Sequence, residues 1–486
     1  MEASKPEAAG SGRIVAVLAF GGIVASIMQT LVVPLLGELP TILDTSASNA
    51  TWVATVTLLA AAVATPIMGR LGDLYGKRRM LLVSTVPLII GSVVAALSTN
   101  LATMITGRAL QGLGVGLVPL GISLLRDLVP PEKLGTSIAL MSASLGIGGA
   151  LGLPFASAIA DYGSWRVLFW VSAALGAVIA VLYKVIVPDT EQRRESVGGF
   201  DYAGAVGLGV GLVALLLAVS KGADWGWGSG TTLGLFAAAV VVLVGWGVWE
   251  LRTAEPMVDL RTTARPQVLL TNAASVVVGF AMYASSLLVP QLLQLPKATG
   301  YGLGQSMMAM GLWMMPGGLM MMAVAPLGGK LTGKHGPKLT LLLGTLVIAA
   351  GYGVSVFLMG AAWQLMVAMC VITAGVGLAY GAMPALIMGG VPQSETAAAN
   401  SFNTLMRSIG TSVSAAVIGV VLAQMTTKLG PVTLPSENAF RTGMLLGCGV
   451  AVVAALITLT IPYRKAQAVT ATEPAAPADL APSPRP

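Results

Sequence analysis

The sequence is dominated by fourteen apolar runs of about 20 residues or more, separated by short polar segments. A helix that crosses the hydrocarbon core of a bilayer needs about 20 mostly apolar residues at ~1.5 Å rise each. The runs are too long for barrel strands and lack their alternation. Only 10% of the residues are charged, whereas soluble domains carry about 25%. We therefore predict an all-α integral membrane protein with 14 transmembrane helices, at 14–36, 52–72, 80–98, 101–125, 135–158, 165–187, 201–219, 232–250, 268–290, 305–327, 339–359, 362–385, 399–425 and 441–462.

The distribution of basic residues predicts the orientation of these spans. An even number of spans places both termini on one side, and most of the 27 lysines and arginines fall on that side. Because such residues accumulate in cytoplasmic loops, both termini are predicted to be cytoplasmic. The polar segment 1–12 is then a cytoplasmic N-terminus, and the Ala- and Pro-rich segment 466–486 is a disordered cytoplasmic tail. The net charge of +7 follows from this bias and does not indicate nucleic-acid binding.

Several classes of chemistry lack the residues that they need. Cys370 and Cys448 are the only cysteines, and His335 is the only histidine. No metal-ligand cluster, nucleophile–base arrangement or Gly-rich phosphate loop lies in the spans, so we expect no metal, no cofactor and no ATP-driven step. The sequence predicts a protein that is not an enzyme.

Two cytoplasmic loops form an internal repeat. GRLGDLYGKRR at 69–79 and GKLTGKHGPKL at 329–339 share a pattern of glycines, a leucine and a basic residue. A second marker, GVGL, occurs at 114–117 and again at 375–378 at nearly the same offset. The repeat predicts two six-helix halves, 13–200 and 268–465, with two inserted helices and a linker at 201–267. Such halves enclosing a site at the midplane are a transporter architecture.

The loop at 69–81 resembles the loop between helices 2 and 3 of the major facilitator superfamily. Further segments at 198–204, 223–229 and 250–261 resemble loops of its fourteen-helix drug:proton antiporter branch. The resemblance implies a major facilitator fold that works by alternating access. It also implies a conformational latch that closes the cytoplasmic side, in which the aspartate faces the start of the thirteenth helix. An ordinary positive-inside loop is the alternative. The latch residues are Gly69, Asp73, Gly76, Lys77, Arg78 and Asp127.

Proton coupling has an incomplete signature in the spans. Arg108 lies about 10 Å inside the fourth span, in a context that resembles a superfamily motif associated with coupling. The antiporters usually have an aspartate in the first helix, but Met28 stands at that place. Glu38 is the remaining acidic candidate. The alternatives are an Arg108 that reaches the outer headgroups and a solvated, interfacial Glu38.

Other residues are candidates for helix packing and for the substrate cavity. Small residues on one helix face allow close contact, and SLGIGGALGLP resembles a variant of the antiporter motif. The packing candidates are Gly112, Gly148, Gly152 and Pro154. The cavity candidates are Gln29, Gln111, Trp313, Tyr380 and Arg407. For Arg407, a cytoplasmic gate and a snorkelling side chain both remain open.

The sequence thus predicts a secondary transporter in a bacterial inner membrane, acting as a monomer surrounded by lipid. Its partners are a small-molecule substrate and protons, with export of hydrophobic or amphipathic drugs or metabolites as the first hypothesis. An uncoupled facilitator or an uptake carrier on the same fold is the second hypothesis, because Met28 replaces the coupling acid. No motif names the substrate.

Overall fold

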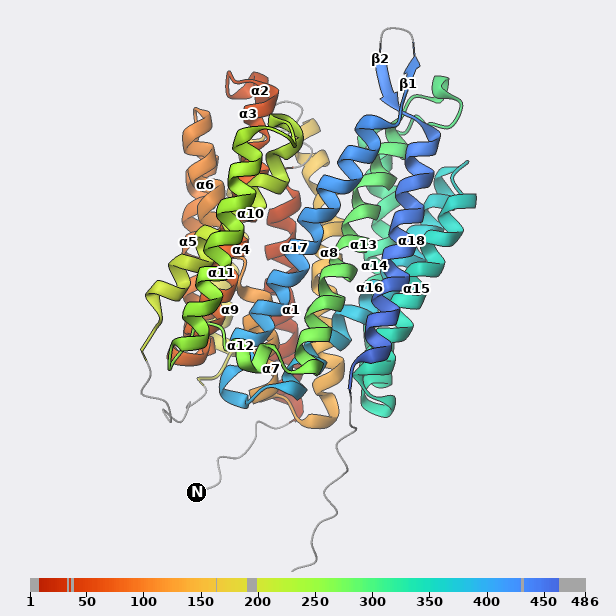
Figure 1. Ribbon diagram of the computed structural model, residues 1–486. Helices are drawn as coiled ribbons and strands as arrows, with labels where there is room; N and C mark the ends of the chain where they lie inside the picture. The colour runs from red at the N-terminus through yellow and green to blue at the C-terminus, as the bar shows by residue number, and fades with distance from the viewer. Residues whose placement is uncertain are drawn as a thin grey trace, which may run out of the picture.

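The computed structural model describes residues 8–32, 35, 39–162, 164–189, 199–429 and 432–462. The described part is almost entirely helical, with one short hairpin (Figure 1). The elements are α1 (Ala8–Thr30), α2 (Leu39–Ile42), α3 (Ala47–Ala50), α4 (Trp52–Tyr75), α5 (Lys77–Ala96), α6 (Leu101–Leu113), α7 (Leu117–Leu128), α8 (Pro131–Tyr162), α9 (Arg166–Ile186), α10 (Tyr202–Trp225), α11 (Gly230–Arg252), α12 (Leu260–Thr263), α13 (Pro266–Gln294), η2 (Lys297–Thr299), α14 (Met307–His335), α15 (Pro337–Phe357), α16 (Ala362–Gly390), η3 (Gln393–Glu395), α17 (Thr396–Gln424), β1 (Thr426–Leu429), β2 (Val432–Pro435) and α18 (Glu437–Thr460).

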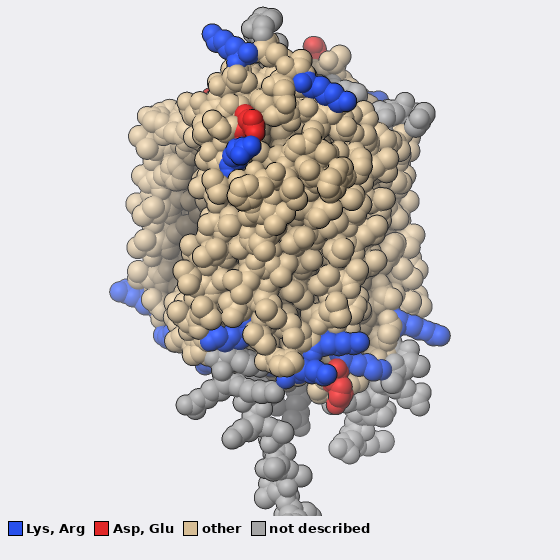
Figure 2. Space-filling model, turned by 90° about the vertical axis from the view of Figure 1, so that its right-hand side faces the viewer, with Lys and Arg blue, Asp and Glu red and all other residues tan. Residues whose placement is uncertain are grey.

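The predicted membrane spans are confirmed within the described residues. Fourteen helical segments are long and apolar enough to cross a bilayer. Figure 2 shows lysines and arginines at both ends of the molecule and a broad belt without charged residues between them on the face in view. This pattern matches the hydrocarbon core of a membrane, where a charge is costly.

The fourth span differs from the prediction because it is broken into α6 and α7. The break lies at Gly114–Gly116, where tight bonds of the i→i+3 type replace the helical ladder. Pro119 contributes to the break, since a proline ring clashes with the carbonyl four residues earlier, here that of Val115. The second GVGL marker stays within the continuous helix α16, where Pro384 lies farther away.

The helices form two halves, each with its own apolar core. One large cluster of buried side chains draws mainly on α1 and α4–α9, and another mainly on α13–α16, α17 and α18. A third, smaller cluster joins α10 to both halves, with Leu208 and Leu212 packed with Leu59 of α4 and Leu405 of α17. The inserted helices therefore lie against the seam between the halves.

The ends of the bundle are distinguishable. Helix α1 begins and α18 ends at the lower end in Figure 1, where the α4–α5 turn also lies. At the opposite end, β1 and β2 pair antiparallel between α17 and α18, with Thr426 opposite Pro435. The segments α2 and α3 lie at this end as well.

Candidate functional site

The carboxylate of Asp73 joins the two halves near the lower end of the bundle. It lies in the last turn of α4, and its two oxygens accept hydrogen bonds from the first turn of α17, from Ala397 N (3.1 Å) and Ala398 N (2.8 Å). Backbone N–H groups in a first helical turn have no partner within the helix and carry the positive end of its dipole. A carboxylate there makes a charge-assisted contact between the halves.

Lys77 lies one turn beyond Asp73 and carries the second link. Its ammonium contacts the Asp127 carboxylate at 2.7 Å and donates to Thr396 Oγ1 at 3.2 Å, with the lysine side chain only 2% exposed. Asp127 also accepts a hydrogen bond from Gln393 at 3.4 Å, and Ser123 bonds Thr396 at 2.8 Å. We call Asp73, Lys77, Asp127 and Thr396 the latch. It holds these ends of the two halves together.

Arg78 has a different position from the one predicted. Its guanidinium donates to the carbonyl of Lys184 at 2.7 Å and pairs with Asp189 at 3.0 Å, at the end of α9. The cation therefore caps the negative end of a helix dipole within its own half. The structure does not bring Arg78 together with the other predicted latch residues, because its long side chain reaches the end of α9 and not α17.

At two glycines of the predicted latch, the backbone leaves no room for a side chain or has a conformation that favours glycine. Gly76 joins α4 to α5 at φ 100°, a conformation that side-chain-bearing residues rarely adopt. Gly69 lies where α4 meets α17: a Cβ added there would be 2.3 Å from Ser401 Oγ and 2.7 Å from the Ala397 carbonyl oxygen. The close approach of these helices brings Asp73 within reach of α17.

The second copy of the repeat has the same backbone form. Gly336 joins α14 to α15 at φ 90°, and Lys338 donates to the carbonyls of Leu459 and Ile461 at the end of α18. At Gly329 a Cβ would be 2.4 Å from Thr136 Cα of α8. The glycines and the basic residue of the motif therefore make similar contacts in both halves, whereas the polar latch does not recur: the counterparts of Asp73 and Lys77 are Gly333 and Pro337.

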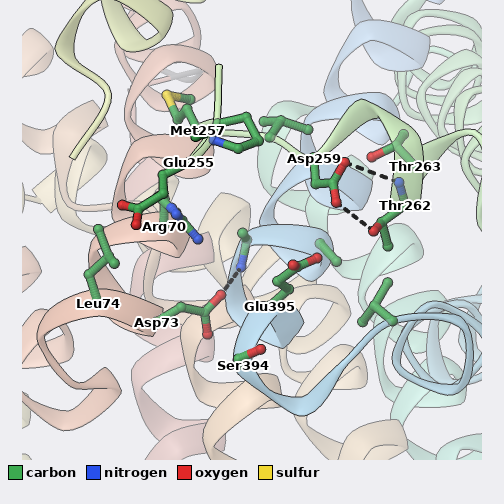
Figure 3. A pocket seen from close by; sticks show the side chains of 16 residues that line it. Arg70, Asp73, Leu74, Glu255, Met257, Asp259, Thr262, Thr263, Ser394 and Glu395 are labelled. Carbon is green, nitrogen blue, oxygen red and sulfur yellow. Dashed lines mark hydrogen bonds between the residues drawn. The ribbon is translucent and has the colours of Figure 1, made fainter. Parts of the chain in front are cut away.

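A pocket of about 230 Å³ lies beside the latch. It is bounded by the last turns of α4, by η3 with the start of α17, and by the linker that follows α11 (Figure 3). Asp259 of this linker caps α12 through bonds from Thr262 and Arg261 N. Burial raises the pKa of the Asp259 carboxyl, but these hydrogen bonds and the Arg261 charge outweigh it, so the pKa lies below its usual range. The linker thus brings the inserted helices to the latch.

Arg108 is buried in the N-terminal half with neutral partners. Its Nε donates to the Val53 carbonyl (3.2 Å), and its Nη1 donates to the Met28 carbonyl (2.9 Å) and to Gln111 Oε1 (2.7 Å). The Gln111 amide donates in turn to Ser92 Oγ at 2.8 Å. Arg108 is 1% exposed, so it does not reach the headgroups by snorkelling. Glu38 lies outside the described residues.

The predicted packing residues lie at helix contacts. Added Cβ atoms would be 2.5 Å from the Thr57 carbonyl oxygen at Gly112, 2.4 Å from the Ile23 carbonyl oxygen at Gly148 and 2.0 Å from Thr30 Oγ1 at Gly152. These contacts join α6 to α4 and α8 to α1. Pro154 of α8 lies against Gly311 of α14 in the other half.

The predicted cavity residues do not form one group. Gln111 is held by Arg108 and Ser92 inside the N-terminal half. Trp313 donates to Gln305 at 3.1 Å near the start of α14, and Gln29 is half-buried on α1.

Arg407 and Tyr380, by contrast, are in contact. The guanidinium lies over the Tyr380 ring, 4.4 Å from its centroid, and the Tyr380 hydroxyl donates to Met282 Sδ at 2.9 Å. Arg407 is 5% exposed, which excludes a side chain that snorkels to solvent.

Sequence reasoning missed the residues of α17 that complete the latch. Thr396 accepts from Lys77, and the N–H groups of Ala397 and Ala398 bind Asp73. Two of these are backbone contacts and leave no signature in the side chains. The preceding QSET segment at 393–396 is a polar helix start after an apolar run, a signal that could have indicated Thr396.

Fourteen candidate spans and a polar contact between two groups of helices are typical of a multi-pass membrane transporter. The model of the Major Facilitator Superfamily matches residues 18–415. The chain belongs to this superfamily. Members of this family are transporters, which confirms that the protein is not an enzyme. Among the described residues, no group of three or more His, Cys, Asp or Glu could hold a metal ion.

The known relatives of this chain have moderate sequence identity to it. An uncharacterized transporter of the same type from Mycobacterium tuberculosis is 30% identical over 83% of this chain and 58% of its own length. The chain therefore spans little more than half of that relative. The tetracenomycin C resistance and export protein of Streptomyces glaucescens is 28% identical over 82% of this chain and 74% of its own. The crystal structure of the human organic anion transporter MFSD10 matches with a TM-score of 0.66 over 92% of this chain and 99% of its own. At 14% identity this likeness shows the fold alone.

Proposed function

We propose that this protein exports hydrophobic or amphipathic small molecules across a bacterial plasma membrane, in exchange for protons. Both termini then lie in the cytoplasm, and the latch closes the cytoplasmic side. Alternating access follows when one half rocks against the other around a midplane site. The observation that carries the transport mechanism is the Asp73 contact with Ala397 and Ala398, because it joins α4 and α17 at one end of the bundle through hydrogen bonds that can separate.

The direction of transport is supported by relatives. The tetracenomycin C protein is named as a resistance and export protein and covers 82% of this chain. The latch itself does not distinguish export from uptake, since a carrier in either direction needs a cytoplasmic closure.

Arg108 is our candidate for the proton-coupling network. It is buried beside Met28, the position at which the related antiporters have an acid, and its charge is met by carbonyl oxygens and an amide. Glu38 is our candidate for the residue that binds the proton, because protonation of its carboxylate would remove one negative charge from the network. The neutral partners also favour a second candidate function, an uncoupled facilitator, because no carboxylate of the described residues pairs with Arg108.

Proteoliposomes that contain a pH-sensitive dye distinguish these functions. Under an imposed proton gradient, addition of a transported dye should cause proton flux in the wild type. Arg108→Ala and Glu38→Gln should abolish this flux, and Arg108→Lys should not restore it, because lysine cannot reproduce the forked hydrogen bonds. Arg441→Ala, which removes an exposed pair with Glu437, is the matched control. Substrate movement without proton flux would contradict coupling and establish the facilitator.

A further inference from the structure

In the part of the chain that the structure describes, the middle of the spans contains buried arginines but no acidic residue. The acidic residues in the described helices and at their starts are within two residues of a helix end: Asp73, Asp127, Glu132, Asp161, Asp201, Asp224, Glu250, Asp259, Glu395 and Glu437. Arg108 and Arg407, by contrast, lie deep in their spans and are 1% and 5% exposed. Counting from the start of α17 at ~1.5 Å per residue, Arg407 lies about 16 Å in, near the midplane of a hydrocarbon core about 30 Å thick.

The two arginines differ in how their donors are used. Arg108 makes three hydrogen bonds, two of them to backbone carbonyls. Arg407 makes one, from Nη2 to Thr404 Oγ1 at 3.1 Å, and its buried Nη1 has no partner among the described atoms. A buried guanidinium without its hydrogen bonds is costly, and the contact with the Tyr380 ring supplies only part of the compensation.

The Arg407 guanidinium lies next to the inward face of α17. Val413 and Val417 are exposed and mark the side of this helix that faces lipid. Thr404, Ser408 and Thr411 lie at helical spacing on the opposite side and are half-buried. Because Arg407 donates to Thr404, its charged group reaches this polar stripe. The same helix packs against α4 of the other half at Gly69, and a major facilitator carries its substrate between the halves.

We propose that Arg407 is the binding residue for a negatively charged substrate, an organic carboxylate or phenolate with an apolar body. This inference rests on the proposed export function and specifies its substrate class. When the halves separate and open this position, the Nη1 that lacks a partner donates to the substrate oxyanion, and the Thr404 and Ser408 hydroxyls border the same position. The soft Met282 side chain and the Tyr380 ring contact the apolar body, since such groups adapt to differently shaped ligands. A cation at this place would be repelled by the buried Arg407 guanidinium, whose partners among the described residues are Thr404 and Tyr380 and include no carboxylate.

Two dyes with the same three-ring xanthene scaffold and opposite charge test this inference: fluorescein, an anion, and rhodamine 123, a cation. Fluorescence polarisation measures their binding to the purified full chain in detergent. We expect the wild type to bind fluorescein at least about tenfold more tightly, because a charge-assisted hydrogen bond is worth roughly this factor. Rhodamine 123 binding as tightly as fluorescein would overturn the inference without the use of any variant.

Substitutions at position 407 then locate the site. Arg407→Gln should weaken fluorescein binding by about tenfold and leave rhodamine 123 unchanged or slightly improved, whereas Arg407→Lys should retain part of the fluorescein affinity. Arg441→Gln, which removes an exposed arginine, is the matched control. The melting temperature and gel-filtration profile establish that each variant is folded. Fluorescein affinity that is equal in wild type and a folded Arg407→Gln would overturn the inference.

Uptake of the same dyes into proteoliposomes separates this inference from the proposed export. Fluorescein binding that depends on Arg407, without transport, would support the anion site and contradict export. Transport of rhodamine 123 alone would leave export standing and overturn the anion site.

Discussion

The α4–α5 and α14–α15 turns occupy equivalent places in the two halves, yet they meet the opposite half differently. Both turns use a glycine with positive φ, at 100° and 90°. Both also place a basic residue, Arg78 or Lys338, at the carbonyl end of the last helix of their half. The first turn adds the Asp73 carboxylate on the N–H groups of α17, whereas the second has Gly333 at that place.

The two halves meet along two helix pairs, α8 with α14 and α4 with α17, and the contacts of these pairs differ in kind. The α8–α14 seam is close-packed along its length, at Gly329 with Thr136, Gly146 with Met321, and Gly311 with Pro154. The α4–α17 seam has the close approach at Gly69 and the polar latch at one end. In the proposed mechanism, the packed α8–α14 contact keeps the halves aligned while one rocks against the other, and the polar α4–α17 contact is broken and remade.

The largest effect is expected at the packed seam. Gly329→Val would place a Cβ 2.4 Å from Thr136 Cα, and backbone atoms cannot move aside. Overpacking of this kind costs about 1–3 kcal/mol or more, so the melting temperature in detergent should fall by several degrees with loss of transport. Gly333→Ala, on the same helix with no atom within 4 Å of its added Cβ, is the control and should behave as wild type. Equal stability of the two variants would refute the view that this seam is close-packed.

An intermediate effect is expected at the latch. Asp73→Asn removes the negative charge from the contact with α17. The amide NH₂ of the asparagine then faces one of the N–H groups of α17, and the contact loses about 1–2 kcal/mol of stabilisation. The closed state should lose about tenfold in population, and transport should fall while membrane insertion stays normal.

A cysteine at position 123 reports the closure of the latch. Ser123 is fully buried and hydrogen-bonded to Thr396 of the latch. In a background without Cys370 and Cys448, labelling of Ser123→Cys from the cytoplasmic side should rise several-fold when Asp73→Asn is added. Asp189→Asn changes an exposed carboxylate and is the matched control. Unchanged transport and labelling in Asp73→Asn would remove Asp73 from the latch.

The smallest effect is expected where the two copies agree. Arg78→Ala and Lys338→Ala each remove a cation from a helix carbonyl end, worth about 0.3–1 kcal/mol. Both variants should lower the melting temperature slightly and to a similar extent, with transport close to wild type. A large loss of stability or transport in only one of the two variants would show that the two basic residues have different roles.

The sequence predicted the spans because each needs a long apolar run, and the glycines of the repeat because a positive φ restricts the residue type. It did not predict the break at Gly114–Gly116, which depends on where Pro119 falls relative to the helical ladder. It also placed Arg78 in the latch, since a long side chain can reach either of two neighbours. The sequence could not predict the neutral partners of Arg108, because two of them are backbone carbonyls, which every residue has.

The position of α10 has a consequence for compounds dissolved in the bilayer. Leu208 and Leu212 pack with residues of both α4 and α17, so this helix covers the line along which the two halves meet. A solute diffusing within the membrane cannot pass between α4 and α17 where α10 lies over them. Entry from the lipid phase between α4 and α17 is therefore blocked. An apolar solute must reach the interior of the protein by another route.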